Sequence, residues 1–171
     1  MEMQKLTAEY GDENDIVSWM ELVHTVSKQF PGLETEESIN EHKCTVLKFM
    51  NEQRAICVKD NNRVEGVLLF SKKHNMICCL AVLPEYREQG IASMLLNTAL
   101  NCLDRTKIIT VSTYRQRDEK GIAARALYKK FGFVEGELIE EFGYPNQRFV
   151  LNPLPGKCGF GNQYPTYQHC L

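Results

Sequence analysis

The most constraining feature of this sequence is one segment in which a strand pattern gives way to a helix pattern. Residues Met76–Val82 form a short apolar run, which is typical of a central strand buried on both faces. Pro84 ends this run, and from Gly90 to Asp104 apolar residues recur at helical spacing along one stripe. A buried strand, a short loop and a helix that begins at a glycine therefore follow one another, so the fold must combine sheet and helix.

Strand and helix patterns also follow one another in the rest of the chain. Before the central segment we expect a short strand at Met3–Leu6, a helix from Asn14 or Asp15 to Pro31-Gly32, and a helix over Glu36–Met50 capped by Thr35. A hairpin of Ala55–Lys59 and Val64–Phe70 turns at Asp60-Asn61-Asn62. After the central segment we expect a strand at Lys107–Thr113, a helix over Ile122–Phe131 that ends at Gly132, and strands at Phe133–Phe142 and Arg148–Leu151.

Composition limits the class of protein. A chain of 171 residues with 43% apolar and 25% charged residues suits one globular domain, which we expect over residues 1–152, with an irregular tail over 153–171. The formal net charge is −2 and no block of like charges occurs, so we expect neither a nucleic-acid nor a membrane partner. We also expect no secretory signal, because no apolar stretch follows a basic start.

The cysteines indicate a reducing compartment. Seven cysteines is an odd number, and no CxxC pair occurs. Cys158, His169 and Cys170 are too few and wrongly spaced for a structural zinc site, so we expect no metal. A cytoplasmic location is therefore the default expectation.

The segment CLAVLPEYREQGIAS, residues 79–93, carries the chemistry. The first turn of a helix presents backbone N–H groups that have no partner within the helix, at the positive end of the helix dipole. Gly90 and Ala92 leave room for an anion to approach these groups, while Arg87 and the Ser93 hydroxyl can add further bonds. A helix that begins with Gly-x-Ala is by itself weak evidence, because many helices begin this way for packing reasons.

Two motifs together resemble those of the GNAT family of N-acetyltransferases. Val82-x-Pro-x-Tyr-Arg87-x-x-Gly90-x-Ala92 is similar to the family's acetyl-CoA signature, R/Q-x-x-G-x-G/A. About thirty residues later, ARALYKKFGF (residues 124–133) is similar to the second signature, A-x-x-L-Y-x-x-x-G-F. The likeness covers at least Leu6–Leu151 and is strongest to small bacterial members whose acceptors are mostly unknown. It implies the GNAT acyl-CoA N-acyltransferase fold, an α/β (α+β) arrangement with a mixed sheet of six or seven strands and about four helices.

The resemblance also implies a cofactor site. The pantetheine arm of acetyl-CoA would bond to the backbone of the strand before the loop, and the pyrophosphate would bind to the loop and the start of the helix; residues of the second motif would complete the site. The residues at these positions are Leu80, Ala81, Val82, Arg87, Glu88, Gln89, Gly90, Ile91, Ala92, Ser93, Ala124, Leu127 and Tyr128.

Tyr128 matches the family's general acid, which protonates the departing CoA thiolate. A thiol has an ordinary pKa near ~8.5 and a phenol near ~10, so a well-placed phenol can supply this proton. A backbone N–H near Leu80 would polarise the thioester carbonyl. Without the motif, a tyrosine on an amphipathic helix would be read as a core residue.

Three positions depart from the family pattern. Gly121 stands where many members have an asparagine that touches the cofactor, Met76 stands where some protein-modifying members have a glutamate base, and Ala92 replaces the usual second glycine. No general base is assigned; the candidates are Glu21, His24, His74, Glu140 and Glu141, or a chain of waters.

The acceptor remains open between two chemistries. The resemblance places it near Phe30, Glu34, Tyr114, Arg115, Tyr144 and Arg148. The acidic run of Glu137, Glu140 and Glu141 would attract a cationic amine, whereas Arg115 and Arg117 would hold the carboxylate of an amino-acid-like acceptor. We expect an acetyl-CoA-dependent N-acetyltransferase that acts on a small amine or an amino-acid-like molecule, as a monomer or a homodimer. The alternatives are a protein lysine or N-terminal acetyltransferase and a non-catalytic acetyl-CoA sensor.

Overall fold

The computed structural model describes residues 5–154. The tail expected from residue 153 therefore lies almost wholly outside the described residues, and so do Cys158, His169, Cys170 and the first half of the strand expected at Met3–Leu6.

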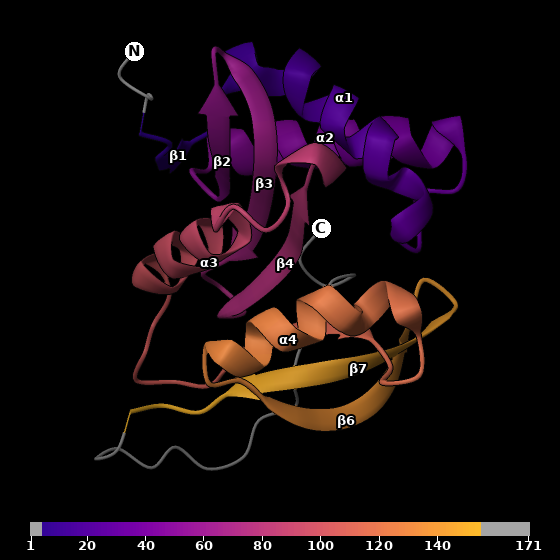
Figure 1. Ribbon diagram of the computed structural model, residues 1–171, viewed down its shortest axis with the longest axis vertical. Coiled ribbons are helices and arrows are strands. Elements are labelled where there is room, and N and C mark those ends of the chain that lie inside the picture. The colour runs from indigo at the N-terminus through magenta and orange to yellow at the C-terminus, as the bar shows by residue number, and fades with distance from the viewer. Residues whose placement is uncertain (1–4, 155–171) are drawn as a thin grey trace. The chain divides into compact units, whose positions relative to one another are not determined.

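Seven strands and four α-helices make up the described chain (Figure 1). The helices are α1 (Ile16–Val26), α2 (Glu36–Asn51), α3 (Ile91–Cys102) and α4 (Ile122–Lys130). The strands are β1 (Ala8–Tyr10), β2 (Ala55–Asp60), β3 (Arg63–Ser71), β4 (Met76–Val82), β5 (Ile109–Tyr114), β6 (Val134–Glu141) and β7 (Tyr144–Leu151). They form one mixed sheet in the order β1-β2-β3-β4-β5-β7-β6, in which β4 and β5 pair in parallel. The expected fold class and element count are confirmed.

The chain divides into two compact units. The first comprises residues 1–69 and 79–99, and the second comprises residues 70–78 and 100–171. Strand β4 contributes its first three residues to the second unit and its last four to the first.

In the first unit, α1 and α2 pack together around large apolar side chains. Trp19 of α1 and Phe49 of α2 are both fully buried. Thr35 caps α2 as expected, in a reciprocal pair of bonds with Ser38. Asp15 occupies the N-cap position of α1, at the expected start of the helix, but its side chain makes no capping bond there. Asp12 instead caps the 3₁₀ turn at Glu13–Asp15 that precedes α1.

The β2–β3 hairpin also follows the predicted turn. Asn61 and Asn62 both have positive φ, 48° and 65°, as a two-residue hairpin turn of the favoured hand requires. Asparagine tolerates this backbone region better than most residues, so these two turn residues determine the turn and the register of the hairpin.

In the second unit, β7 pairs antiparallel with β5 on one side and with β6 on the other. Asn75 joins the start of β4 to the segment after α3: its side-chain amide donates to the carbonyls of Asp104 (2.9 Å) and Ile108 (3.0 Å) and accepts from the Asp104 N–H. Phe149 of β7 is fully buried and contacts α4.

Three predicted elements need correction. The first strand lies at Ala8–Tyr10, and the described residues Lys5 and Leu6 are not in a strand. Strand β7 begins at Tyr144, four residues earlier than expected; its proline, Pro145, lies near the strand start, where a sheet tolerates proline. The middle of β4, Cys78 to Leu80, is only partly buried, so the expectation of burial on both faces holds only for the ends of this strand.

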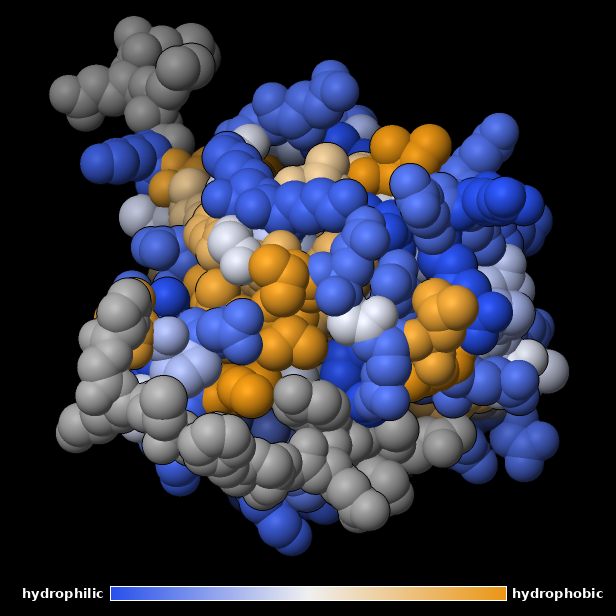
Figure 2. Space-filling model, turned by 90° about the horizontal axis from the view of Figure 1, so that it is seen from below, coloured by the Kyte–Doolittle hydropathy of each residue, from blue (hydrophilic) through white to orange (hydrophobic). Residues whose placement is uncertain are grey.

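Exposed apolar side chains occur in separate groups among polar ones on the face shown in Figure 2. The most exposed large ones are Val17, Ile122, Leu138 and Leu154. No helix in residues 5–154 is long and apolar enough to cross a membrane.

Candidate functional site

The loop after β4 is anchored to its own unit by backbone bonds. The Leu83 N–H donates to the Glu65 carbonyl of β3 (2.9 Å), and Pro84–Tyr86 forms a single 3₁₀ turn in which Tyr86 donates to Leu83 (3.0 Å). The loop then reaches α3 through two residues with positive φ, Glu88 (62°) and Gly90 (82°). The path of the chain at the end of β4 is therefore fixed before the helix begins.

Residues 87–93, which we call the anion loop, present a run of free backbone donors. The first backbone N–H to donate into α3 is that of Met94, which bonds to the Gly90 carbonyl at 3.0 Å. Within the described chain, the N–H groups of residues 88–93 donate to no protein acceptor. A Cβ at Gly90 would have no atom within 4 Å, so the space beside these donors is open. This arrangement can bind an anion with several phosphate oxygens.

The Arg87 side chain is bound within the protein, whereas the sequence predicted that it would add bonds to the anion. Its guanidinium donates to the side chain of Gln29 (Nη2 to Oε1, 2.8 Å) and to the Val82 carbonyl (Nε, 3.3 Å). Arg87 therefore braces the anion loop against its own unit while leaving its positive charge beside the loop. The Ser93 hydroxyl makes no hydrogen bond within the described residues.

Strand β4 pairs in parallel with β5 where Met76 lies opposite Thr110, at the beginning of β4. The partly buried positions Cys78, Cys79 and Leu80 follow this pair. Leu80 thus has the partial exposure that its proposed contact with a ligand requires, while Ala81 and Val82 are buried.

Gly66 of β3 determines how closely α3 approaches the sheet. A Cβ at this position would lie 2.6 Å from Cγ2 of Ile91 and 3.0 Å from Cδ1 of Leu95. Only glycine allows this contact, and the contact positions Ile91, the first residue of α3. Sequence reasoning missed this role, because a glycine inside a strand pattern signals a close approach without naming the partner.

Glu65, next to Gly66, is also a residue that the sequence analysis missed. Its side chain is fully buried and neither carboxylate oxygen has a hydrogen bond of good geometry within the described chain; the nearest cation, Nε of Arg63, is 3.7 Å from Oε1. Burial raises the pKa of the Glu65 carboxyl, while Arg63 and the nearby Tyr86 hydroxyl oppose the rise. Burial, and then the charge of Glu65, raise the pKa of Tyr86. A buried carboxyl thus lies against the turn that leads into the anion loop.

The second motif lies in the second unit and ends α4. The Gly132 N–H donates to the Lys129 carbonyl (3.0 Å), and the Phe133 N–H donates to the Tyr128 carbonyl (3.0 Å). With Gly132 at φ 90°, this is a Schellman motif, and the accompanying apolar contact is that of Tyr128 with Phe133, whose ring centroids are 5.7 Å apart. The spacing of tyrosine, glycine and phenylalanine in this motif is therefore the spacing of a helix end.

Tyr128 itself is buried, with 4% of its surface exposed, and its ring also contacts Phe149 at 6.0 Å. Ala124 and Leu127 on the same helix are partly exposed. Arg125, which the motif analysis left without a role, is buried under Phe149: it donates to the Tyr114 carbonyl and to Gln147, and pairs with Glu135 at 2.6 Å.

Gly121 has a structural explanation. A Cβ there would lie 2.8 Å from the Tyr114 Cβ and 3.2 Å from the Tyr114 carbonyl oxygen. The asparagine that many family members carry would not fit at this position, so this chain makes no side-chain contact from it.

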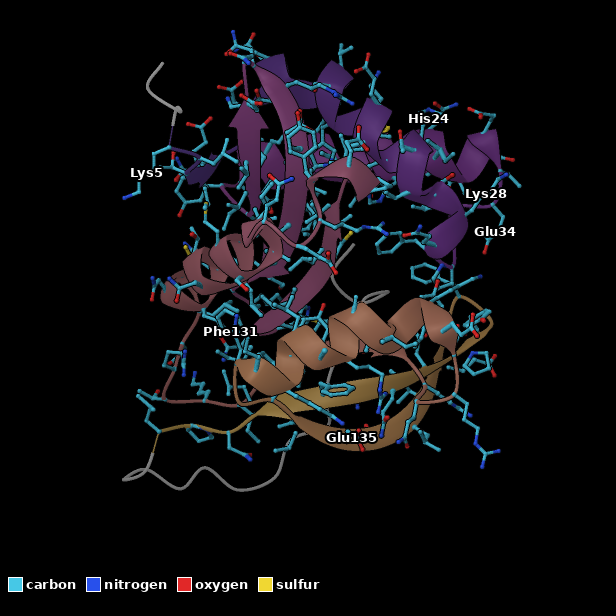
Figure 3. The ribbon with its side chains drawn as sticks, in the orientation of Figure 1. Lys5, His24, Lys28, Glu34, Phe131 and Glu135 are labelled. Carbon is cyan, nitrogen blue, oxygen red and sulfur yellow. The ribbon has the colours of Figure 1, made fainter. Side chains whose placement is uncertain are left out.

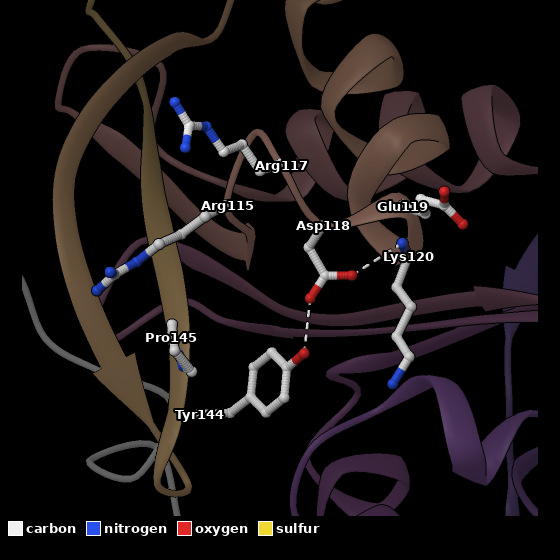
Figure 4. A pocket seen from close by; sticks show the side chains of 7 residues that line it. All are labelled: Arg115, Arg117, Asp118, Glu119, Lys120, Tyr144 and Pro145. Atoms are coloured by element: carbon white, nitrogen blue, oxygen red, sulfur yellow. Dashed lines mark hydrogen bonds between the residues drawn. The ribbon is translucent and has the colours of Figure 1, made fainter.

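A pocket of about 570 Å³ lies in the second unit, beside the segment between β5 and α4 and the start of β7 (Figure 4). We call it the Arg117 pocket; its lining residues are Arg115, Arg117, Asp118, Glu119, Lys120, Tyr144 and Pro145. Two of the predicted acceptor residues, Arg115 and Tyr144, line it, and Tyr114 packs edge-on against Tyr144 with ring centroids 5.2 Å apart. Arg148 is buried instead, in an ion pair with Glu137.

The candidate bases are scattered over the two units. Glu21 and His24 are exposed on α1. Figure 3 shows His24 and also Glu34, one of the predicted acceptor residues. His74 is partly buried and Glu140 is exposed. Glu141 is buried and accepts from the Asn146 amide at 3.3 Å, so it is not a solvated surface residue.

Comparison with known proteins identifies the class of protein. The Acetyltransf_7 model, described as Acetyltransferase (GNAT) domain, matches residues 51–135, which include both motifs. Many solved structures share the fold. A GNAT acetyltransferase from Bacillus cereus is 20% identical, with a TM-score of 0.68 over 88% of this chain and 99% of its own. No match was found among curated proteins.

Two further structures share the fold. YncA from Salmonella typhimurium, solved with its cofactor acetyl-CoA, is 12% identical, with a TM-score of 0.68 over 91% of this chain and 98% of its own. The ribosomal-protein-S18-alanine N-acetyltransferase from Escherichia coli is 16% identical, with a TM-score of 0.65 over 92% of this chain and 100% of its own. The match of residues 51–135 to the GNAT acetyltransferase domain confirms the family resemblance, and the solved structures confirm the fold.

Proposed function

We propose that this protein is an N-acetyltransferase that moves the acetyl group of acetyl-CoA to a primary amine. The observation that carries the proposal is the anion loop, where six consecutive N–H groups, those of residues 88–93, have no acceptor within the described chain, and where a Cβ at Gly90 would meet no described atom within 4 Å. A pyrophosphate presents enough oxygens to accept from such a run.

The residues of the anion loop, Arg87 to Ser93, would hold the pyrophosphate, and the backbone of Leu80, Ala81 and Val82 would bond to the amides of the pantetheine arm. Ala124, Leu127 and Tyr128 of α4 would complete the contact with acetyl-CoA. Gly66 supports this assignment, because it allows Ile91 and therefore the first turn of α3 to lie against β3. A site that depends on backbone donors needs such a fixed helix start.

Transfer would proceed by direct attack. The amine lone pair forms a C–N bond to the thioester carbonyl carbon, and a backbone N–H near Leu80 stabilises the oxygen that becomes negative. The C–S bond then breaks, the amide nitrogen loses its proton to a base or to water, and the CoA sulfur leaves as a thiolate. The Tyr128 hydroxyl would give this thiolate a proton.

The test is acetyl-CoA-dependent release of free CoA over a panel of polyamines, amino acids, aminoglycosides and peptides, with Tyr128→Phe beside the wild type. Release that requires an amine, with the acetylated amine identified by mass spectrometry, is the expected result. Acetylation of peptides alone would move the assignment to a protein acetyltransferase, the activity of the E. coli enzyme named above. Binding of acetyl-CoA without transfer to any amine would contradict the proposal and favour a sensor.

A further inference from the structure

The Arg117 pocket has an uneven set of charges. Three cationic side chains line it, Arg115, Arg117 and Lys120, against two carboxylates, Asp118 and Glu119. Glu119 lies on the opposite side of the turn from the two guanidinium groups (Figure 4). The arginine side of the pocket is therefore positive.

Asp118 is already bound within the protein. Its carboxylate accepts from the Tyr144 hydroxyl (2.6 Å) and from the Lys120 N–H (3.0 Å), as the dashed lines in Figure 4 show. The bond from Tyr144 lowers the pKa of Asp118 and raises that of Tyr144. The Lys120 ammonium lies over the rings of Tyr114 and Tyr144, 5.9 and 5.8 Å from their centroids. These contacts form a fixed wall of the pocket.

Arg115 and Arg117 differ in how many of their hydrogen-bond donors are already used within the described chain. Arg115 donates to the carbonyls of Asn146 (Nε, 3.1 Å) and Ile139 (Nη2, 3.0 Å), so its guanidinium is held in place while Nη1 makes no bond to the described residues. Arg117 is exposed, and its side chain has no hydrogen-bond or ion-pair partner among residues 5–154. A planar guanidinium with free donors matches the two oxygens of a carboxylate.

The acidic strand that would attract a cationic acceptor is largely neutralised within its own unit. On β6, Glu135 pairs with Arg125 (2.6 Å) and Lys129 (2.7 Å), and Glu137 pairs with Arg148. Glu141 is buried and accepts from the Asn146 amide. Glu140 is the one carboxylate of the acidic run for which the described chain provides no cation or donor. Between the two acceptor chemistries that the sequence left open, the structure therefore favours the anionic one.

We infer that the Arg117 pocket binds the carboxylate of the acceptor, so that the acceptor is an amine that also carries a carboxylate, as an amino acid or its derivative does. This inference rests on the proposed acetyltransferase function. Arg117 is the primary partner of the carboxylate, and Nη1 of Arg115 is the second. The side chains of Tyr144 and Pro145 provide the apolar part of the wall.

The test compares each amino acid with its α-amide, which keeps the amine and removes the negative charge. Acetyl-CoA-dependent release of CoA is measured for a set of such pairs with the wild type, Arg117→Ala and Arg117→Lys. We expect the wild type to favour the acid, and Arg117→Ala to lower kcat/KM for the acid by roughly 10- to 100-fold, the loss of one charge-assisted bond, without changing kcat/KM for the amide. Arg117→Lys keeps the positive charge but loses the planar pair of donors, so its kcat/KM for the acid should fall between those of the wild type and Arg117→Ala.

Arg105→Ala is the matched control, because Arg105 lies in the same unit, outside the pocket, and also has no partner in the described chain. It should leave the preference for the acid intact. Equal kcat/KM for acid and amide in the wild type, or an equal loss for both in Arg117→Ala, would overturn the inference while leaving the acetyltransferase proposal standing.

A second measurement does not depend on turnover. Titration of the protein with N-acetyl amino acids and with their amides, followed by calorimetry, should show binding of the acids that Arg117→Ala weakens. Such binding without any transfer would contradict the acetyltransferase proposal but support the pocket. Equal affinity for acids and amides, or binding of neither, would overturn the pocket.

Discussion

Replacing Gly66 with alanine tests whether the contact between β3 and α3 sets the position of the anion loop. The added Cβ would lie 2.6 Å from Cγ2 of Ile91 and 3.0 Å from Cδ1 of Leu95. Leu95 can move the end of its side chain, but Cγ2 is attached directly to the Cβ of a β-branched residue that is stiff in a helix. Ile91 is buried, so the clash must shift the start of α3.

The expected cost follows from overpacking. Inserting one methyl group into a filled core destabilises a protein by about 1–3 kcal/mol, which lowers Tm by roughly 2–12 °C for a chain of this size. Because the same shift moves the backbone donors of Ile91, Ala92 and Ser93, acetyl-CoA should bind about 10-fold more weakly, as expected for the loss of one charge-assisted bond. Thermal unfolding and calorimetric titration measure the two effects.

Ile91→Ala provides the matched background. This substitution removes Cγ2 and costs about 2–5 kcal/mol on its own, but it leaves room for the new Cβ. In a double-mutant cycle, Gly66→Ala should therefore cost much less in the Ile91→Ala background than in the wild type. An equal cost in both backgrounds, or an unchanged affinity for acetyl-CoA in Gly66→Ala, would refute the reasoning.

Two further predictions concern single groups. Burial raises the pKa of Glu65 in the folded state. Above the ordinary glutamate pKa of ~4.3, the folded protein therefore binds more protons than the unfolded chain, and the free energy of unfolding falls as the pH rises toward the raised pKa. The Tm of the wild type relative to Glu65→Gln should therefore rise as pH is lowered from 7 toward 4, and parallel Tm curves would show that burial does not disfavour the charged form. Tyr128→Phe should lower kcat by ~10- to 1000-fold while leaving the Kd for acetyl-CoA nearly unchanged; unchanged turnover in steady-state kinetics would remove Tyr128 from the mechanism.

Most of the architecture could be predicted because its signals are local. The Thr35 cap, the Asn61-Asn62 turn and the helix end at Gly132 depend on bonds between residues close in sequence. The first strand was misplaced because Ala8–Tyr10 is only three residues long and takes its conformation from pairing with β2, which no local pattern reveals.

The residues that the sequence did not assign to the site act across the sheet. Gly66 and Glu65 on β3 support a loop that follows β4, and Arg125 on α4 binds to residues of β5, β6 and β7. Their roles depend on partners ten or more residues away, so neither spacing nor composition identifies them. The charge pairing on β6 is equally non-local, which is why the sequence left the acceptor open between a cation and a carboxylate.

The most direct test of the central claim is calorimetric titration of acetyl-CoA into Gly90→Glu, with Gly143→Glu as the control. The two glycines are closely matched: both have positive φ, 82° and 72°, and a Cβ at either would meet no atom within 4 Å, so the backbone strain and the added charge are alike. Only Gly90 lies in the anion loop. We predict that Gly90→Glu loses binding of acetyl-CoA while Gly143→Glu keeps it; wild-type affinity in Gly90→Glu would show that the pyrophosphate does not bind at the start of α3.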